Sequence, residues 1–130
     1  VLAALDDAER IVIGPSNPFV SIGPILAVAG VREHLAARRD EVVAVSPIVA
    51  GAALKGPADR MLTELGHEAS VVGVARMYAE LAATLVIDTA DAARAGAVEA
   101  AGMRCVVTPT IMHGIDDAAA LAKVTLWDGT

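Results

Sequence analysis

The sequence predicts an α/β fold that is Rossmann-like and doubly wound, with a mainly parallel sheet flanked by helices. Short apolar runs recur along the chain, and a segment with apolar residues at helical spacing follows most of them. This alternation is typical of β-α-β units. The composition agrees, because 55% of the residues are hydrophobic but only 2% are aromatic, as expected where Ala, Val, Leu and Ile pack helices onto a parallel sheet.

Four apolar runs are predicted to be buried parallel strands. They occupy residues 10–13, 42–45, 84–87 and 104–107. Residues 71–74 are also rich in valine, but Val71, Val74 and Tyr78 share one face of a helix. We favour a helix there, with Ser70 as its cap, and keep a fifth strand as the alternative.

The segments around these strands are predicted to be helices. They cover residues 1–8, 30–39, 57–65, 70–82, 89–101 and 116–126. Pro57 suits a first helical turn, and Gly66 and Gly102 suit carboxyl-terminal caps. Asp116 and Asp117 favour a first turn because they complement the helix dipole. No repeat or low-complexity linker interrupts the sequence, so residues 1–130 are interpreted as a single α/β unit.

Charge and composition exclude several functional classes. With 10 basic and 16 acidic residues the formal charge is -6, and no run of Lys and Arg exists, so we expect no nucleic-acid partner. No apolar stretch reaches the ~18 residues that span a bilayer, and no basic region of a signal peptide follows Val1. We therefore expect a cytoplasmic protein with no membrane partner. His34, His67 and His113 lack metal-ligand spacing, so a zinc site is not expected.

The nucleophilic side chains do not indicate covalent catalysis. Cys105 lies in an apolar run and is interpreted as a small buried residue rather than a reactive thiol. No GxSxG elbow surrounds Ser16, Ser21 or Ser46, and no GxxxxGK[ST] loop occurs. Serine hydrolase and P-loop NTPase chemistry therefore lose support, and catalysis by positioning of substrates is preferred.

The carboxyl ends of the predicted strands form the candidate site, because ligands bind at that edge of open parallel sheets. The first strand is followed by Gly14, Pro15, Ser16, Asn17 and Pro18. Glycine lets a ligand approach the backbone, Ser and Asn offer hydrogen bonds, and free amides at a following helix start favour an anion. The alternative is a rigid turn, because Gly-Pro and Asn-Pro pairs are common in turns.

The other strand ends add hydroxyls, a cation and a carboxylate. Ser46 and Pro47 follow the second strand, and Lys55 precedes a predicted helix start, where it meets a phosphate or is an ordinary surface lysine. Asp88 follows the third strand. A divalent ion is one role for this carboxylate, but a helix cap is the favoured interpretation. Thr108 begins the loop after the fourth strand.

Ordered motifs resemble those of the 2-phospho-L-lactate transferase and phosphoenolpyruvyl transferase family, which builds a deazaflavin coenzyme. They are GPSNP at 14–18 continuing into SIGPIL at 21–26, SPIV at 46–49 through LKGP at 54–57, and LVID at 85–88. VARMY at 74–78 and TPTIM at 108–112 extend the resemblance over residues 10–126. Ala50 departs from the pattern, because the family often has a second glycine before Gly51.

The resemblance implies transfer of a phosphoenolpyruvyl or 2-phospholactyl group from a guanylylated donor to hydroxy-deazariboflavin (Fo). GMP is released, and Mg2+ supports the reaction. The Ala- and Arg-rich composition resembles actinobacterial members, which favours the phosphoenolpyruvyl donor. By resemblance, the residues that line the guanine-nucleotide cleft are Gly14, Pro15, Ser16, Asn17, Pro18, Ser46, Pro47 and Lys55.

The resemblance also implies that this chain is the carboxyl-terminal part of a larger transferase. The family's Gly-rich loop, and the Asp and Arg that hold deazaflavin and metal, belong to a preceding segment. The catalytic and metal-binding residues are therefore expected outside these 130 residues, the chain alone is expected to be inactive, and a homodimer is expected. Two rival interpretations remain: a nucleotide-sugar-binding regulator of the same fold, and an interaction module without a ligand.

Overall fold

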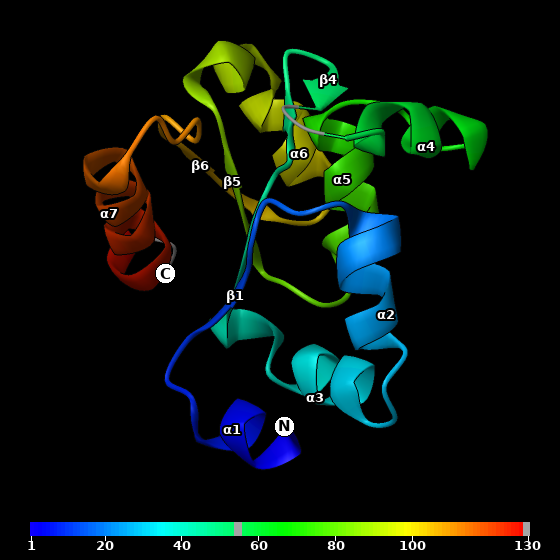
Figure 1. The fold of residues 1–130 in the computed structure, drawn as a ribbon, viewed down its shortest axis with the longest axis vertical. Helices are drawn as coiled ribbons and strands as arrows, with labels where there is room; N and C mark the ends of the chain where they lie inside the picture. Colours follow the sequence, from blue (N-terminus) through cyan, green and yellow to red (C-terminus); the bar gives the residue numbers. More distant parts are fainter. Residues whose placement is uncertain (54–55, 129–130) are drawn as a thin grey trace.

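Parallel strands form the central sheet of the computed structural model, which describes residues 1–53 and 56–128 (Figure 1). The strands are β1 (Ile11–Ile13), β2 (Val42–Val45), β5 (Thr84–Ile87) and β6 (Arg104–Val107). They lie in the order β1-β2-β5-β6, and all three pairings are parallel. The predicted α/β class and all four predicted strands are confirmed, although β1 begins one residue later than predicted.

Helical segments connect the strands. The α-helices are α1 (Leu2–Asp7), α2 (Gly23–Leu26), α3 (Val31–Ala37), α4 (Ala58–Glu64), α5 (Val71–Tyr78), α6 (Ala95–Ala100) and α7 (Ile115–Lys123). Shorter 3-10 or π segments are η1 (Pro18–Ile22), η2 (Arg39–Glu41), η3 (Thr89–Arg94) and η4 (Val124–Asp128). The predicted helices are confirmed, with ends that differ by a few residues, and the helix predicted over 89–101 divides into η3 and α6.

Local chemistry explains how several helices begin and end. The hydroxyl of Ser70 accepts hydrogen bonds from the amides of Val72 and Gly73, both at 3.2 Å, and so caps α5. The alternative of a strand over residues 71–74 is therefore wrong. Gly66 and Gly102 follow α4 and α6 with φ of 84° and 107°, the left-handed conformation that a glycine cap supplies.

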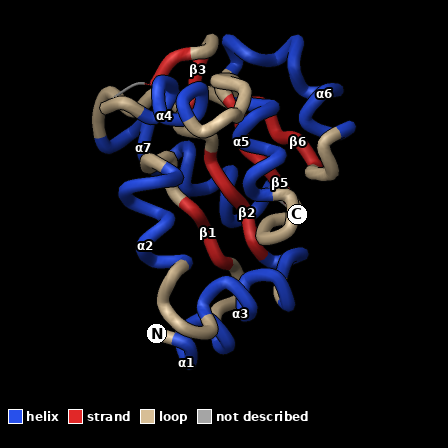
Figure 2. Tube along the Cα trace, turned by 90° about the vertical axis from the view of Figure 1, so that its right-hand side faces the viewer, coloured by secondary structure: helices blue, strands red, loops and turns tan. Residues whose placement is uncertain are grey.

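Two segments outside the predicted helices and strands also have regular structure. Residues 18–26 are helical as η1 and α2. Asn17 caps η1, because its side-chain oxygen accepts from the amides of Phe19 at 2.8 Å and Val20 at 3.2 Å. Residues 48–53 form an antiparallel hairpin of β3 (Ile48–Val49) and β4 (Ala52–Ala53). Figure 2 shows this hairpin beyond the carboxyl ends of the parallel strands.

The two faces of the sheet carry two separate cores. Along β2, Val42 and Ala44 belong to the larger core, whereas Val43 and Val45 belong to the smaller one, as the alternation of side chains in a strand requires. The larger core also takes side chains from α2, α3, α4, α5 and α6. Leu121 of α7 packs in the smaller core, and α7 stands alone on that side of the sheet (Figure 1). Helices therefore cover both faces, as a doubly wound fold predicts.

No single helix in the described part of the chain is long and apolar enough to cross a membrane. Pro18–Leu26 and Val31–Ala37 reach the required length and composition only when taken together, and they are bent by 90°. Leu26, Val31 and Leu35 of these segments are buried in the larger core.

Candidate functional site

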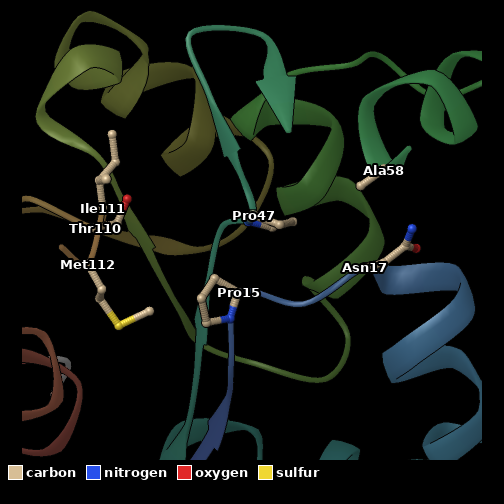
Figure 3. A pocket seen from close by; sticks show the side chains of 7 residues that line it. All are labelled: Pro15, Asn17, Pro47, Ala58, Thr110, Ile111 and Met112. Atoms are coloured by element: carbon tan, nitrogen blue, oxygen red, sulfur yellow. The ribbon is translucent and has the colours of Figure 1, made fainter. Parts of the chain in front are cut away.

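A pocket of about 350 Å³ lies at the carboxyl end of the sheet (Figure 3). Its walls come from the loop after β1, the segments on either side of the β3–β4 hairpin, and the loop after β6. The lining residues are Pro15, Asn17, Pro47, Ala58, Thr110, Ile111 and Met112. This is the edge at which ligands bind in open parallel sheets, so the predicted location of the site coincides with a pocket.

Two of the lining residues are prolines, and they lie between the other labelled side chains in Figure 3. Pro15 follows β1 and Pro47 follows β2, and these neighbouring strands are aligned so that Ile13 pairs with Ala44. Residues 110–112 lie on one side of the prolines, and Asn17 lies on the other. Because proline carries no N–H, this floor presents ring carbons instead of amide donors. Such a surface suits the face of a flat ring better than a charged group.

Asn17 lines the pocket, but its carbonyl oxygen is already used to cap η1. Its side-chain nitrogen lies 3.5 Å from the sulfur of Met61. The amides of Ser21 and Ile22 donate to the backbone oxygen of Asn17. The expectation that free amides at this helix start receive an anion is therefore wrong, because the first turn is satisfied from within the chain.

The remaining residues of the loop after β1 shape it without lining the pocket. The amide of Ser16 donates to the carbonyl of Gly14 at 2.8 Å, which makes a tight turn. The side chain of Ser16 is exposed, and Pro18 is buried at the start of η1. The loop therefore contains a tight turn, and Pro15 and Asn17 are the two members of the predicted cleft that it contributes to the pocket. Its role in nucleotide binding stays a prediction.

The side chain of Ser46 forms hydrogen bonds with the backbone of Ile48. It is 1% exposed, and its hydroxyl both donates to the carbonyl and accepts from the amide of Ile48, at 3.1 Å each. Its own amide donates to the carbonyl of Val86. The hydroxyl therefore fixes the exit from β2, and the next residue, Pro47, is the one that reaches the pocket. Lys55 lies outside the described residues, so its role stays a prediction.

Asp88 caps the helical segment that follows β5, as the favoured interpretation predicted. Its Oδ2 atom accepts from the amide of Ala90 at 2.9 Å, and its Oδ1 atom accepts from the amide of Thr110 at 2.8 Å and its hydroxyl at 3.3 Å. Burial opposes ionisation of the carboxyl, but the hydrogen bonds from Thr110 and Ala90 outweigh it and hold the pKa of Asp88 below its usual value. The carboxylate thus stays charged at neutral pH.

Asp91 is a buried carboxylate at this edge that the sequence analysis did not single out. Its Oδ2 atom accepts from the amide of Ala50 at 3.0 Å. Ala50 has a φ of 51° and Gly51 one of 83°, so the turn of the hairpin is left-handed at both central residues. The alanine that departs from the family pattern therefore keeps the turn that glycine favours. No local signal in the sequence marks this contact, because Asp91 and Ala50 are 41 residues apart.

Within residues 1–53 and 56–128, the His, Cys, Asp and Glu side chains are the possible metal ligands, and Cys105 is the free thiol. No group of three or more His, Cys, Asp or Glu side chains in these ranges is placed to hold a metal ion. Cys105 packs partly buried against the larger core. Burial, with a contribution from Glu99, raises the pKa of its thiol to about 11, so the thiol is neutral at pH 7 and the interpretation as a packing residue holds.

The comparisons with known proteins agree on one family. The family model described as 2-phospho-L-lactate transferase CofD matches residues 1–111. The phosphoenolpyruvate transferases of Streptomyces griseus and Kitasatospora aureofaciens are 46% and 44% identical to this chain over 127 residues. The 2-phospho-L-lactate transferase of Methanothermobacter thermautotrophicus is 40% identical over 126 residues. Each alignment covers 97% of this chain and 40% of the relative, so the chain spans about 40% of their length. The chain therefore belongs to the 2-phospho-L-lactate transferase CofD family.

Proposed function

We propose that this chain forms part of a transferase that moves a phosphoenolpyruvyl or 2-phospholactyl group from a guanylylated donor to Fo and releases GMP. The observation that carries the proposal is the pocket at the carboxyl edge, because six of its seven lining residues lie in the motifs GPSNP, SPIV and TPTIM, which carry the family resemblance. Membership of a transferase family supports the reaction class. The phosphoenolpyruvyl donor is preferred, because the relatives at 46% and 44% identity are phosphoenolpyruvate transferases.

The pocket is proposed to receive the base or ribose of the guanine nucleotide. A flat ring would rest on Pro15 and Pro47, with the buried Thr110, whose hydroxyl donates to Asp88, at the side. Lys55 is proposed to meet the phosphates of the donor and of the leaving GMP. Catalysis would then consist of holding the Fo hydroxyl in line with the donor phosphorus, without a covalent enzyme intermediate.

Magnesium and the remaining partners are proposed from the family resemblance. Protein ligands for Mg2+ are proposed to come from the segment that precedes these motifs in the family, together with the phosphate oxygens that this ion prefers. A homodimer and a cytoplasmic location are proposed on the same ground, and the activity of this chain alone is expected to be absent.

Calorimetric titration with GMP and GDP, with AMP as control, tests the nucleotide site. We expect selective binding of the guanine nucleotides in the presence of magnesium. Lys55→Ala is expected to weaken binding, whereas Lys123→Ala, in the last turn of α7, leaves it unchanged and serves as the matched control. Equal affinity of GMP for the protein and its Lys55→Ala variant contradicts the role of Lys55. Absence of any guanine selectivity in the intact transferase favours the regulator or interaction module instead.

A second pair of variants tests whether the pocket itself holds the nucleotide. Met112 lines the pocket, whereas the neighbouring Ile115 is 87% exposed and does not. Met112→Trp is expected to fill the pocket and lower GMP affinity, and Ile115→Trp is expected to have no effect. If both variants bind GMP as the unmodified protein does, the nucleotide lies elsewhere.

A further inference from the structure

Two buried aspartates stand in the same helical turn after β5. Asp88 is 6% exposed and Asp91 is 8% exposed. The amide of Asp91 donates to the backbone oxygen of Asp88 at 2.9 Å, so the two residues are fixed relative to each other. In residues 1–53 and 56–128 neither carboxylate forms a salt bridge with a basic side chain. Their charges are instead satisfied by hydrogen bonds, which point to two different segments of the chain.

Asp88 holds the loop after β6. One oxygen of its carboxylate accepts two bonds from Thr110, at 2.8 and 3.3 Å, while the other accepts from Ala90 at 2.9 Å and lies 3.5 Å from the hydroxyl of Thr89. Thr110 is buried and lines the pocket, and it begins the run that continues with Ile111 and Met112. The position of this side of the pocket therefore depends on Asp88.

Asp91 holds the hairpin on the other side. Its carboxylate accepts from the amide of Ala50, whose left-handed conformation costs a non-glycine residue about 1 to 2 kcal/mol. A charge-assisted hydrogen bond is strong enough to compensate for that cost. The hairpin separates Pro47 from Ala58, and both of these residues line the pocket. Fixing the turn at Ala50 therefore limits how far this side of the pocket can move.

We infer that Asp88 and Asp91 are positioning residues that together hold opposite sides of the pocket at a fixed separation. A pair of buried carboxylates at this edge also resembles a pair of metal ligands. The oxygens of Asp88, however, already meet two donors each, which occupies the lone pairs that a cation would need. The identity of the ligand rests on the proposed function, but the role in positioning does not.

Hydrogen exchange of the backbone amides tests the positioning directly. Asp91→Ala is expected to accelerate exchange at Ala50 and in the hairpin, because the acceptor is lost. Asp91→Asn keeps an oxygen that accepts from the same amide, so exchange should stay close to that of the unmodified protein. Asp40→Ala, at an exposed position in η2, is the surface control. Unchanged exchange in the Asp91→Ala variant overturns the inference.

Asp88 is tested with asparagine, because the alanine variant loses the helix cap as well and its folding is less secure. Asp88→Asn offers one acceptor oxygen where the carboxylate offers two, and its NH2 group faces amide and hydroxyl donors. Faster exchange at Thr110, with a native thermal transition, is the expected result. Exchange at Thr110 that matches the unmodified protein overturns the role of Asp88.

GMP affinity then connects the two aspartates to the pocket. Asp91→Ala is expected to weaken GMP binding about tenfold, since small misplacements of a binding wall are costly, and Asp91→Asn is expected to restore it. An Asp91→Asn variant as impaired as Asp91→Ala overturns the inference in favour of a direct role for the charge. If the intact transferase does not bind GMP, the proposed function fails, while the exchange data still decide whether the aspartates position the two segments.

Discussion

The two faces of the sheet differ in how completely helices cover them. On the face of the larger core, side chains of β2 and β5 such as Ala44 and Leu85 are fully buried beneath several helices. On the face of the smaller core, Val43 is fully buried as well, but Val12 of the neighbouring strand β1 is 40% exposed. A groove of about 300 Å³ with a mostly apolar lining separates β1 from α7 there. One helix thus buries the centre of this face and leaves its edge open.

This difference shows that the covering helices, rather than the strand sequence, determine how far a strand side chain is buried. Val12 and Val43 are the same residue type, and they are register partners in adjacent parallel strands. Their exposure differs because α7 reaches β2 and not the whole of β1. We therefore expect stability to be concentrated on the face of the larger core.

The largest expected effect comes from adding a side chain at Gly73, in the helix α5 that packs against the larger core. A Cβ atom at this position of α5 would lie 1.8 Å from the carbonyl oxygen of Glu68, which belongs to the backbone and cannot turn aside. We expect Gly73→Ala to lower the free energy of unfolding by about 4 kcal/mol or more. Gly96 of α6 has no atom within 4 Å of its added Cβ, so Gly96→Ala should stabilise the helix by about 0.5 to 1 kcal/mol. Urea denaturation of both variants makes the comparison.

Removing one leucine from each core compares the faces directly. Leu85 of β5 lies in the larger core and Leu121 of α7 lies in the smaller one. Leu85→Ala is expected to cost about 3 to 4 kcal/mol, and Leu121→Ala about 2 kcal/mol, because a cavity near the open groove relaxes more easily. Equal losses in denaturant unfolding would show that the two cores are packed equally well.

Valine-to-threonine substitutions on the adjacent strands β1 and β2 test how much of this face of the sheet α7 buries. Val43→Thr buries a hydroxyl and is expected to cost about 2 kcal/mol, whereas Val12→Thr at the exposed edge should stay within about 0.5 kcal/mol of the unmodified protein. Thermal or urea unfolding provides the measurement. A large loss at Val12 would mean that this edge is covered in solution.

A smaller effect, in this case a gain, is expected at Tyr78 inside the larger core. Its hydroxyl is buried and has no hydrogen-bond partner among the described residues, and burial raises the pKa of Tyr78 above its usual value. Removing an unsatisfied buried hydroxyl is expected to raise the free energy of unfolding of Tyr78→Phe by about 1 kcal/mol. A loss of stability would instead reveal a partner for the hydroxyl, for example a water molecule.

Most of the fold could be predicted because buried parallel strands produce continuous apolar runs. The sequences of β2 and β5 are buried at every position, and the helices α4 and α6 are followed by glycines with positive φ, Gly66 and Gly102. The hairpin could not be predicted in this way. Its turn places Ala50 in a conformation that its own sequence disfavours, and the stabilising contact comes from Asp91, which is far away along the chain.

The candidate site could be predicted in position but not in every side chain. Pro15, Asn17 and Pro47 do line the pocket, because strand ends determine the edge at which ligands bind. Ser46 follows β2, as Pro47 does, yet its hydroxyl bonds to the backbone of Ile48. A serine can bond either to the backbone or to a ligand, and the residue type alone does not predict which. Met112 belongs to the motif TPTIM, but the sequence does not predict that it lines the pocket, since an apolar side chain at this position is equally expected in a hydrophobic core.

The parallel topology has a consequence for how the pocket assembles. No two strands of the sheet are joined by a tight turn, so each pairing must first close a long loop, which slows folding. The crossover from β5 to β6 is the shortest of the three, and the bonds between Asp88 and Thr110 join the ends of these same strands. We therefore expect the side of the pocket that contains Thr110 to form before the side that depends on the contact between Ala50 and Asp91.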